Sequence, residues 1–264
     1  MLLDEWRSAP LTVPPYFLPG DHDLLRAQGA FEDTNPQVTT GSNRGGARIE
    51  ERFQLGLLPI PFQGDIRNAV VYLLMINPAS RGTTEELEAE SRPEWRMHLM
   101  QNIRQEADRE FPFFSLNPDY PLGYSYWYPR LRWLVSAYEL SGMSRTDALK
   151  QVSKLFCAVE IVPYFSRRAP SIFLSNDPPS QLHSSRLVIN HVVNEVLPRA
   201  NAGQALVVVG RKTGLWGLPR DARNVFPNSD VPNAVVPRSG HFILELRHIV
   251  LDWLRGRGFL SHSS

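Results

Sequence analysis

The sequence predicts an α/β fold: a three-layer α/β/α sandwich around a central, mainly parallel sheet of about four strands. Two observations support this expectation. Four short apolar runs, which begin near residues 70, 156, 205 and 234, have the length and composition of strands buried on both faces. Segments with apolar residues at helical spacing separate these runs. Strands that alternate with helices form parallel sheets whose faces are covered by those helices.

The first part of the chain is expected to be an irregular lead-in, rich in Pro and Gly, over residues 1–60. Five prolines interrupt any regular element there, namely Pro10, Pro14, Pro15, Pro19 and Pro36. Residues 59–65 are rich in turn-forming residues and lead toward the first strand. No internal repeat and no clear second domain is visible, so we expect residues 1–264 to form one domain.

The first strand is predicted over residues 70–76, an apolar run that stops at Asn77-Pro78. Proline has no N–H and restricts the residue before it, so the ladder of hydrogen bonds cannot continue. Three helices are expected next, over residues 94–110, 130–140 and 147–155. Residues 112–129 lie between the first two of these helices, and we interpret them as an aromatic loop.

The second half of the chain repeats the pattern of strand and helix. Strands are predicted at 156–162, 205–209 and 234–236, and a proline closes the first and the last of these. Helices are expected over residues 180–197, in a short segment from Arg211, and over residues 239–255. The complete order therefore alternates strands with helices from residue 70 to residue 255.

Composition excludes several classes of protein. With 264 residues, of which 42% are hydrophobic and 21% charged, the chain can bury a substantial core. The formal net charge of +1 gives no global field toward nucleic acid or membrane. The single cysteine, Cys157, permits neither a disulfide framework nor a Cys-rich metal site. No signal peptide and no apolar stretch of membrane-spanning length is visible, so we expect a cytoplasmic protein.

Familiar nucleotide and hydrolase motifs are absent from the sequence. It has no Walker motif and no Gly-x-Gly-x-x-Gly after a strand, which argues against a nucleoside triphosphatase and a dinucleotide enzyme. Gly-x-Ser-x-Gly and His-Glu-x-x-His are also missing. The seven histidines show no metal-ligand spacing, and we expect neither a metal nor a cofactor.

Polar residues gather where the four predicted strands end. Because the carboxyl ends of parallel strands meet at one edge of the sheet, this edge is the expected ligand site. The loops there offer backbone N–H groups and basic side chains to an anion. The residues singled out in these loops are Asn77, Pro78, Ala79, Ser80, Tyr164, Phe165, Arg167, Arg168, Arg211, Lys212, Arg238, Ser239 and His241.

Each candidate has two interpretations from sequence alone. Asn77 either orients a water or bonds only its own turn. Tyr164 or Phe165 either stacks on a base or belongs to the core. Arg167 and Arg168 are phosphate contacts or solvated loop charges. His241, at a predicted helix start where a positive charge is disfavoured, is a neutral hydrogen-bond donor or a structural residue.

This layout resembles the uracil-DNA glycosylase superfamily. That family places a Gly-x-(Asn/Asp/Ala)-Pro-(Gly/Tyr) motif after its first core strand, and Met75-Ile76-Asn77-Pro78-Ala79 is similar to its Asn-Pro-Gly form. Its second motif, His-Pro-Ser or Asn-Pro-Ser, follows the last strand, where this chain has Val236-Pro237-Arg238-Ser239-Gly240-His241. Residues 61–65 and the strand after them resemble uncharacterised bacterial members of the fold. The resemblance covers roughly residues 60–256.

The resemblance implies a DNA-repair hydrolase that cleaves the N-glycosidic bond of a damaged or deaminated base, after flipping that base out of the stack. It implies that Asn77 holds the attacking water and that His241, or backbone N–H groups near Ser239, stabilise the departing base. Other loop residues would line the substrate pocket (Pro78, Ala79, Ser80, Tyr164, Phe165, Ser239). Basic residues would grip DNA phosphates (Arg167, Arg168, Arg211, Lys212, Arg238). The expected partner is DNA or a nucleotide, bound by a monomer away from any membrane.

Two other functions remain open at this point. One is a protein of the same fold that binds nucleic acid or a nucleotide without catalysis. It is favoured by Met75, which replaces the family's Gly, and by Val236, which replaces the motif His or Asn. The other is a hydrolase that acts on a small nucleoside or sugar-phosphate.

Overall fold

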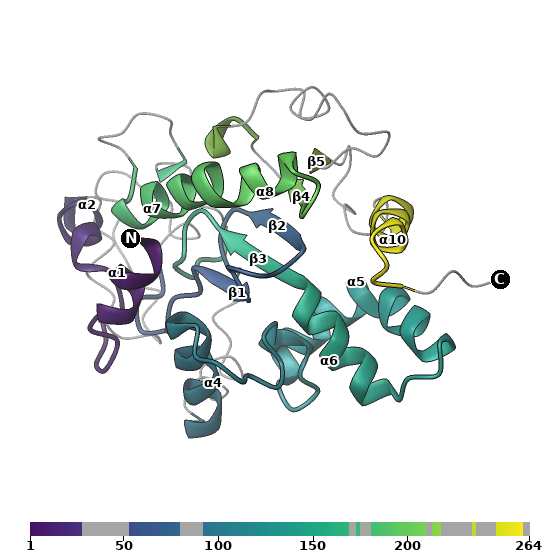
Figure 1. The fold of residues 1–264 in the computed structure, drawn as a ribbon. Coiled ribbons are helices and arrows are strands. Elements are labelled where there is room, and N and C mark those ends of the chain that lie inside the picture. The colour runs from purple at the N-terminus through teal and green to yellow at the C-terminus, as the bar shows by residue number, and fades with distance from the viewer. Residues whose placement is uncertain are drawn as a thin grey trace.

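A computed structural model describes residues 1–27, 53–79, 92–168, 173–174, 181–209, 213–217, 234–235 and 247–260. The chain is a mixed α/β protein (Figure 1), with a five-stranded sheet in the order β1-β3-β2-β4-β5. Three pairings, β2–β3, β2–β4 and β4–β5, are parallel, and β1 pairs antiparallel with β3. The strands are β1 (Phe62–Gly64), β2 (Val71–Met75), β3 (Phe156–Glu160), β4 (Leu206–Val209) and β5 (Ala234–Val235).

The four strands predicted from the apolar runs are confirmed as β2 to β5. The fifth, β1, is a correction, since residues 59–65 were expected to be only a turn-rich approach. This strand is three residues long and ends at Gly64, whose φ of 117° falls where L side chains rarely go. A Cβ at this position would lie 2.3 Å from the backbone oxygen of Phe156, so a glycine is needed for the close approach of β1 to β3.

Both faces of the central strands are buried, which explains their continuous apolar sequence. Along β2, Tyr72 and Leu74 belong to one core cluster, and Val71 and Leu73 belong to the other. This alternation is the two-residue period of an extended strand.

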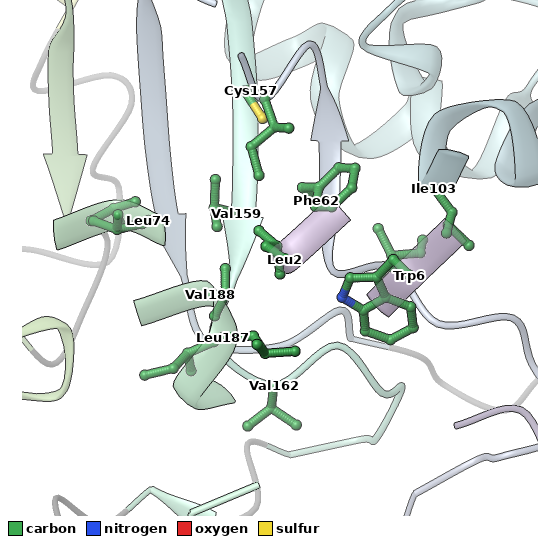
Figure 2. Packing of buried hydrophobic residues seen from close by; sticks show 14 of the residues in the cluster. Leu2, Trp6, Phe62, Leu74, Ile103, Cys157, Val159, Val162, Leu187 and Val188 are labelled. Carbon is green, nitrogen blue, oxygen red and sulfur yellow. The ribbon is translucent and has the colours of Figure 1, made fainter. Parts of the chain in front are cut away.

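The first cluster is covered by helices from three parts of the chain. Helices α1 (Leu2–Ser8), α4 (Pro93–Arg104) and α7 (His183–His191) place apolar side chains in it. Figure 2 shows this packing, with Trp6, Ile103 and Val188 gathered around the side chains of the strands. After α7 the helix continues as a π-helical turn over Val192–Val196 and then as α8 (Leu197–Asn201), which contributes Ala200.

The second cluster contains side chains from the other long helices. Helices α5 (Pro121–Leu140), α6 (Arg145–Leu155) and α10 (Arg247–Gly256) contribute Leu131, Leu149 and Leu254 to it. Figure 1 shows α7 and α8 along one side of the strands and α5 and α6 on the other side. The sheet is therefore packed on both faces.

Several helix boundaries differ from the sequence prediction. The aromatic segment expected as a loop over residues 112–129 is helical from Pro121, because proline is favoured in the first turn of a helix. Helix α5 also continues through Pro129. Helix α4 ends at Arg104, before the expected residue 110, and Gln105 follows with a left-handed φ of 52°. The expected helix over 147–155 is confirmed as α6.

Other predicted helices are described only in part. The short helix expected from Arg211 is present as a 3-10 turn over Thr213–Trp216. Helix α10 occupies the end of the segment expected to be helical from residue 239, and the start of that segment lies outside the described residues. The lead-in over residues 1–60, which was expected to be irregular, contains regular structure between its prolines. This structure consists of α1, a 3-10 turn over Pro19–Asp21 and α2 (His22–Ala27). In the described part of the chain, no helix has both the length and the apolarity of a membrane span.

Candidate functional site

The candidate site lies at the carboxyl ends of β2 and β3. The chain leaves β2 to form β3 on one side and later returns to form β4 on the other side of β2. Such a reversal of strand order is a topological switch point, and open α/β sheets bind ligands just outside the strand ends there. The switch point lies between β2 and β4, and residues 210–212 directly after β4 lie outside the described residues. The loop after β2 is described, and it is joined to the neighbouring loop after β3.

Asn77 in the loop after β2 has a fixed side-chain orientation. Its Nδ2 donates to the carbonyl oxygen of Pro78 at 3.1 Å and to the Oγ of Ser166 at 2.9 Å. The Pro78 carbonyl can only accept a hydrogen bond, so the amide nitrogen must face it. The Ser166 hydroxyl donates its own proton to the carbonyl of Arg168 at 2.6 Å, so its oxygen is left to accept from Asn77.

This arrangement leaves the Oδ1 of Asn77 as an acceptor that is not used within the described part of the chain. Both amide hydrogens are committed, and no partner of Oδ1 is found among the described residues. The side chain is half-buried. Asn77 therefore bonds its own turn, which was one of the two interpretations of this residue from sequence. The same bonds leave its side-chain carbonyl oxygen available to a bound molecule or water.

Ser166 is a site residue that the sequence reasoning missed. It is fully buried, and its backbone pairs with Ala79 in an isolated parallel bridge. Further backbone bonds join the two loops, from the Val162 N–H to the Ile76 carbonyl at 2.8 Å and from the Ser166 N–H to the Pro78 carbonyl at 3.4 Å. The loops after β2 and β3 are thus held together, and Asn77 is positioned by both. A serine six residues after the end of β3 carries no signal in the sequence that would single it out.

Glu160 is the second residue that the sequence reasoning passed over. It is the last residue of β3, lies opposite Met75 in the register of β2, and is 4% exposed. Its Oε2 is buried without a hydrogen-bond partner. Burial raises the pKa of this carboxyl to about 8, so the uncharged acid is the main form at neutral pH. The sequence could have drawn attention to Glu160, because it is the one charged residue in the apolar run 156–162.

The expectation that Tyr164 lines the substrate pocket is corrected by the structure. Its side chain belongs to the core and offers no surface on which a base could stack. Its side chain is 1% exposed, and its hydroxyl donates to Oδ2 of Asp21 at 2.5 Å while it accepts from the Leu18 N–H at 3.0 Å. The other carboxylate oxygen of Asp21 accepts from the N–H of Ser184, in the first turn of α7, at 3.1 Å. Burial raises the pKa of both Tyr164 and Asp21. This network ties the lead-in to the loop after β3.

The remaining predicted residues fall into two groups. Phe165 is half-buried and packs against the first core cluster, whereas Arg167 and Arg168 are exposed beside the Asn77–Ser166 contact. The structure thus brings Asn77, Pro78 and Ala79 next to residues 164–168. The other candidates lie outside the described residues (Ser80, Arg211, Lys212, Arg238, Ser239, His241).

Two surface hollows lie away from this edge. One, of about 210 Å³, is lined by α4 and the segment after it, and the other, of about 330 Å³, includes Asp65 and Asn68 in the loop that enters β2. Arg109 lines both hollows. The second is therefore at the amino end of β2, opposite the candidate site.

No group of three or more His, Cys, Asp or Glu side chains suited to a metal ion occurs within the described ranges. Comparison with protein-family models found no match for this chain. Comparison with curated proteins found none either. No solved structure matched. The function is therefore inferred from the geometry at the sheet edge and from the motif resemblance.

Proposed function

We propose that the carboxyl edge of β2 and β3 is the active site of an N-glycosidic hydrolase that removes a damaged or deaminated base from DNA. The observation that carries the proposal is the orientation of Asn77, whose amide nitrogen is bonded within the protein and whose Oδ1 is left to a ligand. The proposal includes the finer architecture: the helices that pack on the two sheet faces would form the outer layers of a three-layer sandwich.

The proposed reaction depends on the Oδ1 of Asn77, which is available to accept a hydrogen bond from a water molecule. In the reaction, the bond between C1′ of the sugar and the base nitrogen breaks, the sugar becomes oxocarbenium-like, and water adds to C1′. Asn77 Oδ1 would accept a hydrogen bond from that water and so direct a lone pair of the water oxygen toward C1′. The contact to buried Ser166 fixes the amide before substrate binds, and pre-organised polar groups of this kind lower barriers most effectively.

DNA would be held by basic side chains around the same edge. Arg167 and Arg168 are exposed next to Ser166, on the loop that positions Asn77. Guanidinium groups suit phosphate oxygens through paired hydrogen bonds. Arg211, Lys212 and Arg238 remain predicted phosphate contacts, and His241 and Ser239 remain predicted stabilisers of the departing base.

A binding protein without catalysis is the second candidate function. Met75, which stands where the glycosylase motif has Gly, is a partly buried residue opposite Glu160 on the last rung between β2 and β3. A side chain at this position takes space that a glycine would leave for the base.

A panel of oligonucleotides tests the proposal. Each would carry one deaminated base (uracil, hypoxanthine or xanthine), in single-stranded and in duplex form, and abasic sites would be revealed by alkaline cleavage. Release of at least one base by the wild-type protein supports the glycosylase. Salt-dependent binding without release, weakened by Arg167→Ala, would identify the binding protein instead. Absence of both release and binding would dismiss both functions.

A further inference from the structure

Glu160 is a buried acid for which the described structure provides no partner. Its side chain is 4% exposed, and Oε2 has neither a hydrogen bond nor a salt bridge. Leaving a buried polar group unsatisfied lowers the stability of the folded protein, and an apolar residue would avoid this cost at a purely structural position. Groups that are kept at such a cost are frequently functional.

The position of Glu160 places it at the same corner of the sheet as Asn77. Glu160 and Met75 face each other on the last rung between β3 and β2, and Asn77 follows Met75 by two residues. With about 3.3 Å per residue along a strand and about 4.8 Å between strands, the Cα atoms of Glu160 and Asn77 are roughly 8 Å apart. This separation is within the span of one nucleotide.

The surroundings of Glu160 keep its proton on the carboxyl. Burial alone raises its pKa to about 8, and no described charged group contributes. On β2 its neighbour is the uncharged Met75. In the loop after β3, the hydroxyl of Tyr164 is bonded to Asp21 and Leu18, and Arg167 and Arg168 are exposed. A carboxyl of this kind, protonated at neutral pH, has the state required of a general acid.

We propose that Glu160 is the proton donor to the departing base, an inference that rests on the proposed glycosidic hydrolysis. The C1′–N bond breaks and its electron pair goes to the base. The Glu160 hydroxyl transfers its proton to that base, which leaves neutral. The water oriented by Asn77 forms the new C1′–O bond, and the proton it loses returns to the Glu160 carboxylate. Water and the nucleoside are consumed, and the free base and the sugar hydroxyl are produced.

The leaving-group dependence of the Glu160→Gln variant tests this role. Glutamine keeps the shape and a hydrogen-bond donor but cannot transfer a proton. Single-turnover release would be measured from two oligonucleotides that differ only in the base, uracil or the more acidic 5-fluorouracil, which needs less help from an acid. We expect E160Q to slow uracil release about 10²–10⁴-fold and 5-fluorouracil release at least tenfold less.

The wild-type protein provides a second readout that does not depend on how the variant folds. Its uracil release should decline as the pH rises through about 8, and its 5-fluorouracil release should decline much less. Equal slowing of both bases by E160Q, together with equal pH profiles for both, would overturn the role of Glu160 while leaving the glycosylase intact. Release of neither pyrimidine would also overturn it, and release of no base from the whole panel would overturn the proposed function as well.

Discussion

Asn77 and Ser166, which are 89 positions apart in the sequence, are joined by a hydrogen bond of 2.9 Å from the Asn77 Nδ2 to the Ser166 Oγ. This bond connects the loop after β2 to the loop after β3. The proton of the Ser166 hydroxyl is used by the Arg168 carbonyl, so the direction of the Asn77–Ser166 bond is determined. The buried serine and the Pro78 carbonyl therefore together determine which atom of Asn77 is presented at the sheet edge.

Ser166→Ala should lower base release through loss of this orientation. Without the serine oxygen, one amide hydrogen of Asn77 loses its acceptor and the amide can rotate. We expect the single-turnover rate to fall about ten- to a hundredfold, less than for loss of the amide itself, with DNA affinity nearly unchanged. Ser153→Ala is a matched control, because Ser153 is also fully buried and also donates to a carbonyl, that of Lys150 at 2.8 Å. An equal loss of rate in both variants would show that Ser166 acts only through stability.

Tyr164→Phe should destabilise the protein and spare the chemistry. The substitution removes the hydroxyl between Asp21 and the Leu18 N–H and leaves a fully buried carboxyl with one bond fewer. We expect the free energy of unfolding to fall by about 1–3 kcal/mol in urea titrations. Base release by the folded variant should stay close to that of the wild type. A large loss of release at unchanged stability would return Tyr164 to the substrate site.

Gly64→Ala should destabilise the protein more than Gly142→Ala, although both glycines have a positive φ. Gly64 and Gly142 both have positive φ, 117° and 96°, so both substitutions strain the backbone. A Cβ at Gly64 would also meet the Phe156 carbonyl oxygen at 2.3 Å, whereas nothing lies within 4 Å at Gly142. We expect Gly64→Ala to lower the melting temperature further, with an extra cost of at least about 1–3 kcal/mol. Equal destabilisation would mean that β1 is not packed closely against β3.

Glu160→Gln should alter the pH dependence of stability. The folded pKa of about 8 lies above the ordinary value of 4.5, so between these limits the folded protein holds a proton that the unfolded chain has released. Stability therefore falls as pH rises through this window, by on the order of 5 kcal/mol from this group, and levels off above pH 8. Urea unfolding of the wild type and the variant at several pH values checks this. Parallel pH profiles would mean that Glu160 titrates normally.

The sequence was informative where burial produces a continuous pattern. The runs that became β2, β3 and β4 are apolar on both faces because helices cover both faces of the sheet, and they could be located without coordinates. Strand β1 could not be located in this way, because a three-residue edge strand from Phe62 to Gly64 has too few residues to show a period. The start of α5 was missed because its first turn contains Pro121 and Gly123, and both residue types are typical of loops.

The position of Asn77 after the carboxyl end of β2 could be predicted, because the apolar run before it already indicates the strand. The side chains that surround Asn77 could be predicted only in part. Ser166 depends on a pairing across 89 positions, which a single sequence does not show. The sequence left Tyr164 open between base stacking and the core, because its partner Asp21 lies in the lead-in, where no regular structure was expected.

If Asn77 acts in the chemical step, its removal should slow base release without weakening the binding of DNA. The single-turnover rate of base release and the equilibrium affinity for the same oligonucleotide would be measured for the wild type and for Asn77→Ala. We expect the rate to fall about 10²–10³-fold while the dissociation constant changes by less than roughly threefold, since an oriented water matters in the transition state and not in DNA binding. Release at the wild-type rate by Asn77→Ala would contradict the account, as would a wild-type protein that binds the oligonucleotides and releases no base.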